Sequence, residues 1–398
     1  MARIVPALVE TSVLQWARVS AGYTVEEAAG KLRTKTKTIE NWESGDKRPS
    51  IGQVRNMATV YKRPFHFFFL EHPPADPPVP HDFRRLPADG MSRYEPALRF
   101  QVRDAYERRQ LALDLATELD ETPQGFMLKT SLRADTETVG QEIRTFLRIE
   151  TADQKRARQP GSNYRLWRSR IEAKDILVFQ IANLTTKQML GMSLSFDALP
   201  VIAVNRKLTH NARVFTLLHE FAHLMLGESG ICDLSEDHLD SPQAQQTEIF
   251  ANKVAAAALL PKADFLAEPI VTARGSGQHE WSNDELNALA NTYGASEETV
   301  LRRFLTLDLT SLTYYQRKRG EYLARYAKLE QQQREEASND DFKRNRPQEV
   351  LSDYGRHFAR LVLMSYAQDR ISLTDASSFL RVKAPMVEKV ERLLAERA

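Results

Sequence analysis

The chain has 398 residues, of which 42% are hydrophobic and 27% are charged, and its formal net charge is +2. This length favours two to three domains with sizeable cores, and the single cysteine, Cys232, excludes an internal disulfide and fits a reducing cytosol. The sequence has neither a membrane-spanning apolar run nor the apolar region of a signal peptide, so we expect a cytoplasmic protein without a membrane partner.

The first 70 residues have the pattern of a small helical DNA-binding domain. Thr24 suits the N-cap of a helix that runs to Leu32, and a short turn leads to a second helix, from about Thr36 to Glu43, which Gly45 ends. This stretch carries 11 Lys and Arg against 6 Asp and Glu, a net charge of +5, so the positive excess lies where DNA binding needs it. The core is expected to hold Ala28, Ile39, Trp42, Val54 and Met57.

This stretch resembles the XRE (lambda-repressor-like) helix-turn-helix family, and we place a five-helix domain of that kind at 1–70. In such modules the second helix enters the major groove, which implies DNA as a partner. Side chains at base edges specify sequence, whereas phosphate contacts give affinity. The candidate base-reading residues are Thr36, Lys37 and Asn41, and the candidate phosphate contacts are Lys35, Lys47 and Arg48. The alternative is a helix-turn-helix used for dimerisation or protein docking.

Prolines mark the start of the next domain. Residues 71–80 are proline-rich and predict a stiff, extended linker. Apolar residues at helical spacing then predict helices over 94–119 and around 136–149. Three apolar runs predict the strands of a small sheet, at 176–179, 189–194 and 201–204. An edge strand of this sheet could hold an extended peptide substrate by backbone pairing.

The run His219-Glu220-Phe221-Ala222-His223 has the pattern of a metal site on a helix. Residues four apart share one helix face, so His219 and His223 can hold one ion, and Glu220 can reach a metal-bound water as a general base. The apolar flanks indicate a buried helix, where two imidazoles are unfavourable unless they are hydrogen-bonded or bind a metal. The alternative is a pair of hydrogen-bonded core histidines.

A catalytic zinc needs a third protein ligand and an open position for water. Glu248 is the best candidate, because it opens an apolar helix on which an unpaired carboxylate is costly. The competitors lie in a polar loop that we expect to be solvated: Asp233, Glu236, Asp237 and His238. Cys232 is a further conceivable ligand or nucleophile, but we expect it to be a small apolar core residue.

The runs 211–224, 248–252 and 259–261 together resemble the ImmA/IrrE family of bacterial metallopeptidases. The stretches 80–87 and 191–205 fit the same family. The resemblance implies that the metal ligands are His219, His223 and Glu248, and that the catalytic acid/base is Glu220. Zinc is the expected ion, although manganese also suits two histidines and a carboxylate. The resemblance names no oxyanion-stabilising residue, and the candidates are Tyr164, His210 and Arg213.

The rest of the chain is predicted to be helical. A helix-turn-helix-like element at about 284–305 closes the expected peptidase domain, which we place at 81–310. Residues 311–348 mix charges of both signs and indicate a solvated connector. The tail, 349–398, suits a small helical domain for docking or homodimerisation. The expected fold class is α+β and predominantly α, with a zincin-like central domain and a three-stranded sheet.

The leading hypothesis is an intracellular zinc-dependent endopeptidase tethered to a DNA-binding module. The family resemblance implies a protein substrate, a helix-turn-helix repressor whose cleavage switches on a stress or mobile-element response. The alternative is a DNA-binding regulator whose peptidase-like domain is a non-hydrolytic sensor of a metal or ligand. A third hypothesis is the toxin or antitoxin of a paired operon.

Overall fold

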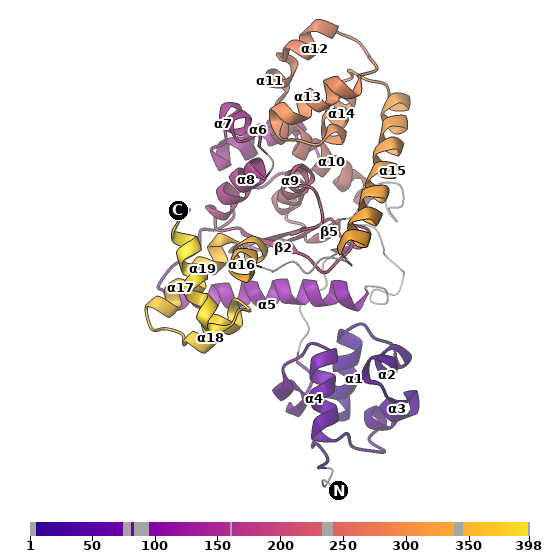
Figure 1. Ribbon diagram of the computed structural model, residues 1–398, viewed down its shortest axis with the longest axis vertical. Coiled ribbons are helices and arrows are strands. Elements are labelled where there is room, and N and C mark those ends of the chain that lie inside the picture. Colours follow the sequence, from indigo (N-terminus) through magenta and orange to yellow (C-terminus); the bar gives the residue numbers. More distant parts are fainter. Residues whose placement is uncertain are drawn as a thin grey trace. The chain divides into compact units, whose positions relative to one another are not determined.

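The computed structural model describes residues 5–74, 81–82, 95–159, 161–232, 242–337 and 345–396. They fall into two compact units, one of residues 5–74 with 95–107 and the other of residues 81–82 with 108–396 (Figure 1). Helices predominate and one small sheet is present, which confirms the predicted α+β, mainly α class. None of the helices in these ranges combines the length and apolar character that a bilayer span requires.

The first unit is a bundle of short helices. Its elements are α1 (Thr11–Ser20), α2 (Val25–Leu32), α3 (Thr36–Ser44), α4 (Ile51–Val60), the 3-10 helix η1 (Phe65–Phe69) and the first part of α5 (Pro96–Glu118). The predicted fifth helix is thus the short η1. Thr24 caps α2 through a capping box with Glu27, and Gly45 ends α3 at a φ of +88°, as the sequence predicted.

The core of this unit confirms the residues predicted to fill it. Ala28, Ile39, Trp42, Val54 and Met57 are all buried. The guanidinium of Arg18 on α1 donates two hydrogen bonds to the carboxylate of Glu43 on α3, at 2.7 and 2.8 Å. Phe100 of α5 is buried against Tyr23, so part of the segment that the sequence placed beyond the linker packs with the first unit.

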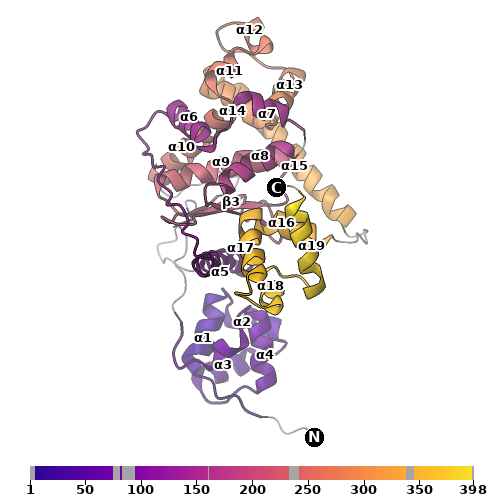
Figure 2. The ribbon, with the colours of Figure 1, turned by 90° about the vertical axis from the view of Figure 1, so that its left-hand side faces the viewer.

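The second unit is built on one sheet. Its strands are β1 (His81–Asp82), β2 (Leu177–Ile181), β3 (Gly191–Leu194), β4 (Val201–Asn205) and β5 (Gly230–Cys232), in the order β1-β5-β3-β4-β2. Strand β3 is antiparallel to β4 and β5, whereas β2 is parallel to β4 and β1 is parallel to β5. The three predicted strands are present, and two short strands extend the sheet. Every residue of β2, β3 and β4 is buried, because helices cover both faces (Figures 1 and 2).

Two helices carry the predicted metal ligands. They are α9 (His210–Leu226) and α10 (Pro242–Leu259), which pack against each other, and α10 also packs on α6 (Thr136–Leu147). Thr209 caps α9, which ends at Gly227 in a left-handed conformation. Gly140 of α6 lets α10 approach closely, because an added Cβ would lie 2.8 Å from the backbone nitrogen of Ala258. This tight helix pairing fixes where α10 places its side chains over α9.

The other helices surround this centre. They are α7 (Thr151–Arg156), α8 (Ser162–Glu172), α11 (Lys262–Leu266), α12 (Pro269–Arg274), α13 (Asn283–Tyr293), α14 (Glu297–Thr306) and α15 (Leu312–Ala337). The predicted helix-turn-helix-like element is the packed pair α13 and α14. The predicted connector begins as the long helix α15.

A C-terminal cluster of four helices packs against the sheet. Its members are α16 (Arg346–Tyr354), α17 (Arg356–Ala367), α18 (Leu373–Phe379) and α19 (Ala384–Ala395). Helix α16 packs on β2, and the guanidinium of Arg168 donates to the carbonyl oxygens of Val178 and Ser352, both at 2.6 Å. The β2 edge is therefore covered, so the hypothesis that a substrate pairs with an edge strand fails for β2.

Candidate metal centre

The buried face of α9 brings its two histidines together. His219 and His223 are 5% and 0% exposed, and their Nε2 atoms lie 3.1 Å apart. This proximity is what the four-residue spacing on a helix predicts. The histidines are therefore paired inside the protein and not on its surface.

Helix α10 brings a carboxylate onto the same point. Glu248 Oε2 lies 3.3 Å from His219 Nε2, and Glu248 Oε1 lies 3.3 Å from His223 Nε2. Glu248 is 7% exposed, as its apolar helix predicted. The other candidates for the third ligand lie outside the described residues. They are Asp233, Glu236, Asp237 and His238.

A fourth donor is present, and it corrects the interpretation of Cys232 as an ordinary apolar core residue. The thiol is buried, but its Sγ lies 3.3 Å from His219 Nε2, 3.6 Å from His223 Nε2 and 3.5 Å from Glu248 Oε1. His219, His223, Cys232 and Glu248 thus form one buried group of ligand atoms. Local sequence patterns did not reveal this contact, because it depends on the pairing of β5 with β3, which are far apart in the chain.

These donors fit a tetrahedral metal ion. The six separations run from 3.1 to 3.6 Å when the nearer Glu248 oxygen is taken for each partner, which is Oε2 for His219 and Oε1 for His223 and Cys232. Zinc bonds of about 2.0–2.3 Å at tetrahedral angles place ligand atoms about 3.3–3.6 Å apart. Imidazole and thiolate are ligands that zinc accepts readily, whereas manganese prefers oxygen. The geometry and the chemistry of the group therefore suit a divalent metal ion.

Glu220 lies beside this group but has different surroundings. It is fully buried, and neither of its carboxylate oxygens has a hydrogen-bond partner at bonding geometry among the described residues. Burial raises the pKa of its carboxyl, against smaller opposing effects of His219 and His223. Gly191 of β3 makes room for it, because an added Cβ would lie 2.9 Å from Glu220 Cδ. A carboxylate with a raised pKa beside a metal site suits a general base.

The charges of the ligands balance one another. Burial lowers the pKa of His223, but the carboxylates of Glu228 and Glu248 outweigh it and raise the pKa to about 10. Burial raises the pKa of Glu248, but His219 and His223 outweigh it and hold the pKa well below the usual value. The Glu248 carboxylate thus favours positive charge at the two imidazoles. A bound dication would supply positive charge at the same place.

An outer polar atom faces the Nδ1 of each imidazole, and sequence reasoning missed both. The Oδ1 of Asn252 lies 3.1 Å from His219 Nδ1, and the Oε2 of Glu228 lies 3.9 Å from His223 Nδ1. An imidazole whose Nδ1–H donates to Asn252 presents the Nε2 lone pair to the metal position. Asn252 was recognisable in principle, since it follows Glu248 by four residues on one helix.

The three candidates for stabilising the oxyanion are His210 and Arg213 on α9 and Tyr164 on α8. His210 and Arg213 precede His219 by nine and six residues on α9, which is about 13 and 9 Å along the helix axis. The guanidinium of Arg213 donates to the backbone oxygens of Leu208 and Arg206. Burial raises the pKa of the Tyr164 hydroxyl, and the Arg213 guanidinium lies 5.9 Å from the centre of the Tyr164 ring.

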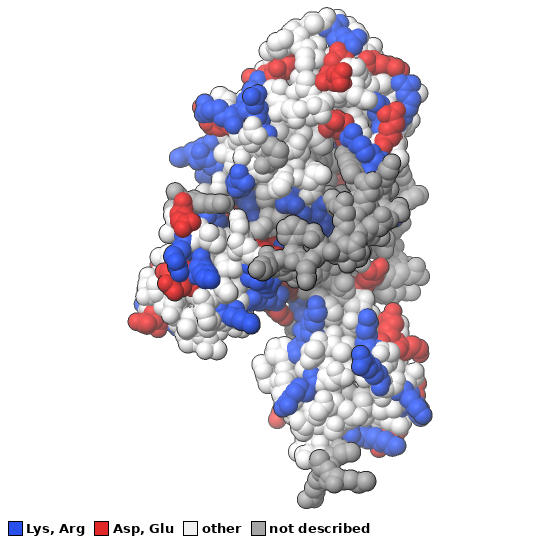
Figure 3. Space-filling view, in the orientation of Figure 1, with Lys and Arg blue, Asp and Glu red and all other residues white. Residues whose placement is uncertain are grey.

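The predicted DNA-contacting residues lie on and beside α3. Lys35, Lys37, Lys47 and Arg48 are exposed, and Thr36 and Asn41 are partly exposed. The Lys37 ammonium lies 3.5 Å from the exposed carboxylate of Glu40, which partly offsets its charge. Figure 3 shows lysine and arginine side chains spread over the visible face of the first unit.

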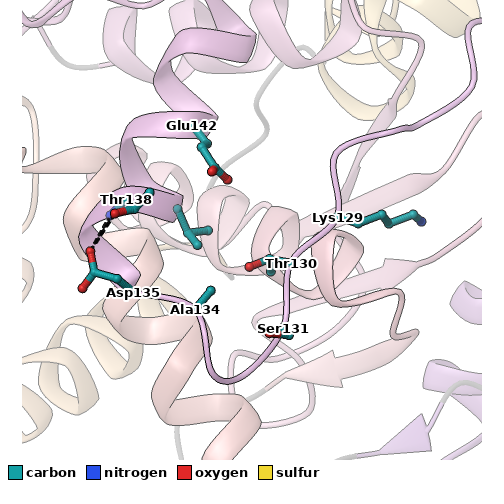
Figure 4. Close-up of a pocket in the computed structure, with 8 residues that line it drawn as sticks. Lys129, Thr130, Ser131, Ala134, Asp135, Thr138 and Glu142 are labelled. Atoms are coloured by element: carbon teal, nitrogen blue, oxygen red, sulfur yellow. Dashed lines mark hydrogen bonds between the residues drawn. The ribbon is translucent and has the colours of Figure 1, made fainter.

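An open hollow of about 440 Å³ lies where the segment before α6 meets that helix (Figure 4). Its lining residues are Lys129, Thr130, Ser131, Ala134, Asp135, Thr138, Val139 and Glu142. Asp135 accepts hydrogen bonds from the backbone and hydroxyl of Thr138, at 2.9 and 2.8 Å, and so caps α6. The hollow contains none of the metal-ligating side chains, so it is separate from the centre described above.

Comparison with known families finds one match in each of the two units. Residues 172–305 match the peptidase M78 family, described as the IrrE N-terminal-like domain, and residues 14–68 match a helix-turn-helix family. The chain therefore contains one segment similar to the IrrE N-terminal-like domain and another similar to a helix-turn-helix family. The IrrE-like match spans α9, Cys232 and Glu248, and the helix-turn-helix match spans α2 and α3. Neither a curated protein nor a solved structure matches the chain.

Proposed function

We propose that this protein is a cytoplasmic zinc-dependent endopeptidase that cleaves a protein substrate, a helix-turn-helix repressor, in a stress or mobile-element response. The observation that carries the proposal is one buried centre in which His219, His223 and Glu248 converge beside the buried carboxyl group of Glu220. The IrrE-like domain supports peptidase chemistry over other uses of a metal.

The proposed mechanism divides the work among these side chains. His219, His223 and Glu248 would hold the ion, while the contact with Asn252 fixes the ring of His219. The bound ion would supply a Lewis acid that polarises the scissile carbonyl and activates a water molecule. Glu220 accepts the proton of that water and then delivers it to the leaving amine.

The first unit supports a location for this chemistry on DNA. Its helix-turn-helix has exposed basic residues at the start of α3 and just after it, where the DNA backbone is contacted in such modules. We infer that this unit brings the peptidase to DNA where a repressor is bound. The substrate would then be met at high local concentration.

The second candidate function is a DNA-binding regulator whose IrrE-like domain senses a metal or ligand without hydrolysis. The observation that favours it is the fourth donor, Cys232, because four protein ligands leave no position for water. The two functions differ in their need for Glu220. A sensor tolerates Glu220→Gln, whereas a peptidase does not.

Two measurements test the proposed function. Elemental analysis of the purified protein should find a single zinc ion per chain, which His223→Ala should lose. The zinc-loaded protein should then cleave an XRE-type repressor encoded beside its gene, and Glu220→Gln should keep the metal and abolish cleavage. Glu142→Gln is the matched control, because it makes the same change in the separate hollow on α6. Cleavage retained by Glu220→Gln would refute the assigned role.

A further inference from the structure

The metal centre has one ligand more than a hydrolytic site needs. A catalytic zinc keeps three protein ligands and an open position for water, whereas four protein ligands make a closed site. Here His219, His223 and Glu248 provide the three, and Cys232 provides a fourth donor within the same 4.8 Å group. The thiol therefore occupies a place that the hydrolytic water would need.

Strand pairing fixes this thiol in place. Cys232 lies opposite Gly191 in the antiparallel register of β5 and β3, and its carbonyl oxygen accepts a hydrogen bond from the backbone nitrogen of Leu190 at 2.7 Å. Gly191 is also the residue that lies against the carboxylate of Glu220. The sheet thus positions Cys232 next to both the ligands and the general base.

The distances single out the thiol as a ligand. Its separations from the two imidazole nitrogens and from the Glu248 oxygen are 3.3, 3.6 and 3.5 Å. Two of these, at 3.5 and 3.6 Å, are the longest separations in the group, as a zinc–sulfur bond of about 2.3 Å requires beside shorter bonds to nitrogen and oxygen. An ordinary core cysteine has no need of three polar neighbours at these separations.

We propose that Cys232 is the fourth metal ligand and that it holds the peptidase in a latent form. Its thiolate completes a closed tetrahedral site, and Glu220 then has no water to activate. Displacement of the thiol from the metal opens the fourth position, and the remaining three ligands form the catalytic site. This inference rests on the proposed peptidase function, since it assigns a control to that same centre.

Cobalt substitution tests the ligand directly. Cobalt(II) bound by a thiolate gives a strong charge-transfer absorption in the near ultraviolet, and Cys232 is the single thiol of the chain, so the band has one source. The full-length wild-type protein loaded with cobalt should show this band. Cys232→Ser and Cys232→Ala should lose the band yet keep a single cobalt ion, with thermal unfolding measured to confirm that both variants fold. Wild-type protein that holds cobalt without the band overturns the inference and leaves the proposed function standing.

Activity then tests the latent state. At equal zinc loading, Cys232→Ala should cleave the repressor at least tenfold faster than wild type (about 1.4 kcal/mol in the barrier). Addition of Glu220→Gln to the same chain should remove that activity. The latent state is overturned if wild type shows the charge-transfer band but Cys232→Ala cleaves no faster than wild type. It is also overturned if Cys232→Ala loses the metal ion. Failure of wild type to bind any metal instead refutes the proposed function itself.

Discussion

Gly191 on β3 lies directly against the carboxyl group of Glu220 on α9. An added Cβ at this glycine would be 2.9 Å from Glu220 Cδ and 2.6 Å from Thr216 Cγ2, distances at which the neighbours must move. Both neighbours are buried on a helix that packs on β3, so neither has free space into which to shift. The position of the Glu220 carboxyl group is thus set by the absence of a side chain on the opposing strand.

Gly191→Ala should therefore impair catalysis without removing the metal. The new methyl group displaces the Glu220 carboxylate, and a misplacement of about 1 Å costs on the order of 100-fold in rate. The measurement is kcat/KM for repressor cleavage together with the metal content. Gly320→Ala is the control, because an added Cβ at that site meets no atom within 4 Å. Equal activity of the two variants would show that Glu220 is not held by this contact.

Asn252→Ala should weaken metal binding. It removes the oxygen that lies 3.1 Å from His219 Nδ1, so the imidazole loses the contact that fixes its orientation. Loss of such an outer contact typically lowers metal affinity by about 10- to 100-fold. Competition with a chromogenic chelator measures the affinity. Asn252→Asp keeps an acceptor oxygen and should bind the metal more tightly than Asn252→Ala; the reverse order would contradict the orienting role.

Helical periodicity explains why part of this centre was predictable. The spacing of His219 and His223 fixes a shared face, and the apolar helix around Glu248 predicts its burial, so local sequence contained this information. The capping residue Thr24 and the stop at Gly45 were predictable for the same reason, since caps depend on neighbours in the chain.

The missed features all depend on contacts between distant segments. Cys232 reaches the metal ligands through the register of β5 against β3, which no periodicity in either strand specifies. The burial of Phe100 in the first unit and the cover of α16 over β2 are likewise long-range packing. Sequence patterns therefore predicted the candidate ligands on helices but not the candidate that a strand supplies.

Glu285 should make the stability of the second unit depend on pH. Its side chain accepts from Arg274 at 2.9 Å and from the backbone of Ser282 at 2.8 Å, where it completes the capping box of α13. These contacts, led by the one with Arg274, lower the pKa of the Glu285 carboxyl from 4.5 to about 2. A carboxyl with a lowered folded-state pKa stabilises the fold above its unfolded-state pKa, and this stabilisation is lost as pH falls toward the folded-state value.

Glu285→Gln should consequently lower the free energy of unfolding at neutral pH, and the difference from wild type should shrink as pH falls from about 5 to about 2. Urea unfolding at a series of pH values measures this difference. Glu280→Gln is a suitable comparison, because that carboxylate pairs with Arg317 at an exposed site and should contribute little. A difference between wild type and Glu285→Gln that does not change with pH would contradict the assignment.

Substitution of a predicted phosphate contact and substitution of a predicted base-reading residue should change DNA binding in different ways. Lys47 is exposed beside α3, and a phosphate contact there carries no sequence information. Lys47→Ala should weaken binding to all duplexes alike and reduce the slope of log affinity against log salt by about 1. Asn41 lies on α3 and is partly exposed, so Asn41→Ala should cost about 1–3 kcal/mol on the preferred duplex and little on others.

Fluorescence anisotropy with a selected duplex and a scrambled one, at several salt concentrations, separates these effects. Lys129→Ala is the control, because it removes one positive charge from the second unit and leaves α3 unchanged. If the helix-turn-helix instead docks a protein, wild type and Lys47→Ala should bind both duplexes equally weakly. The exposed charges around α3 would then belong to a protein interface, and the peptidase would find its repressor by direct contact and not through shared DNA.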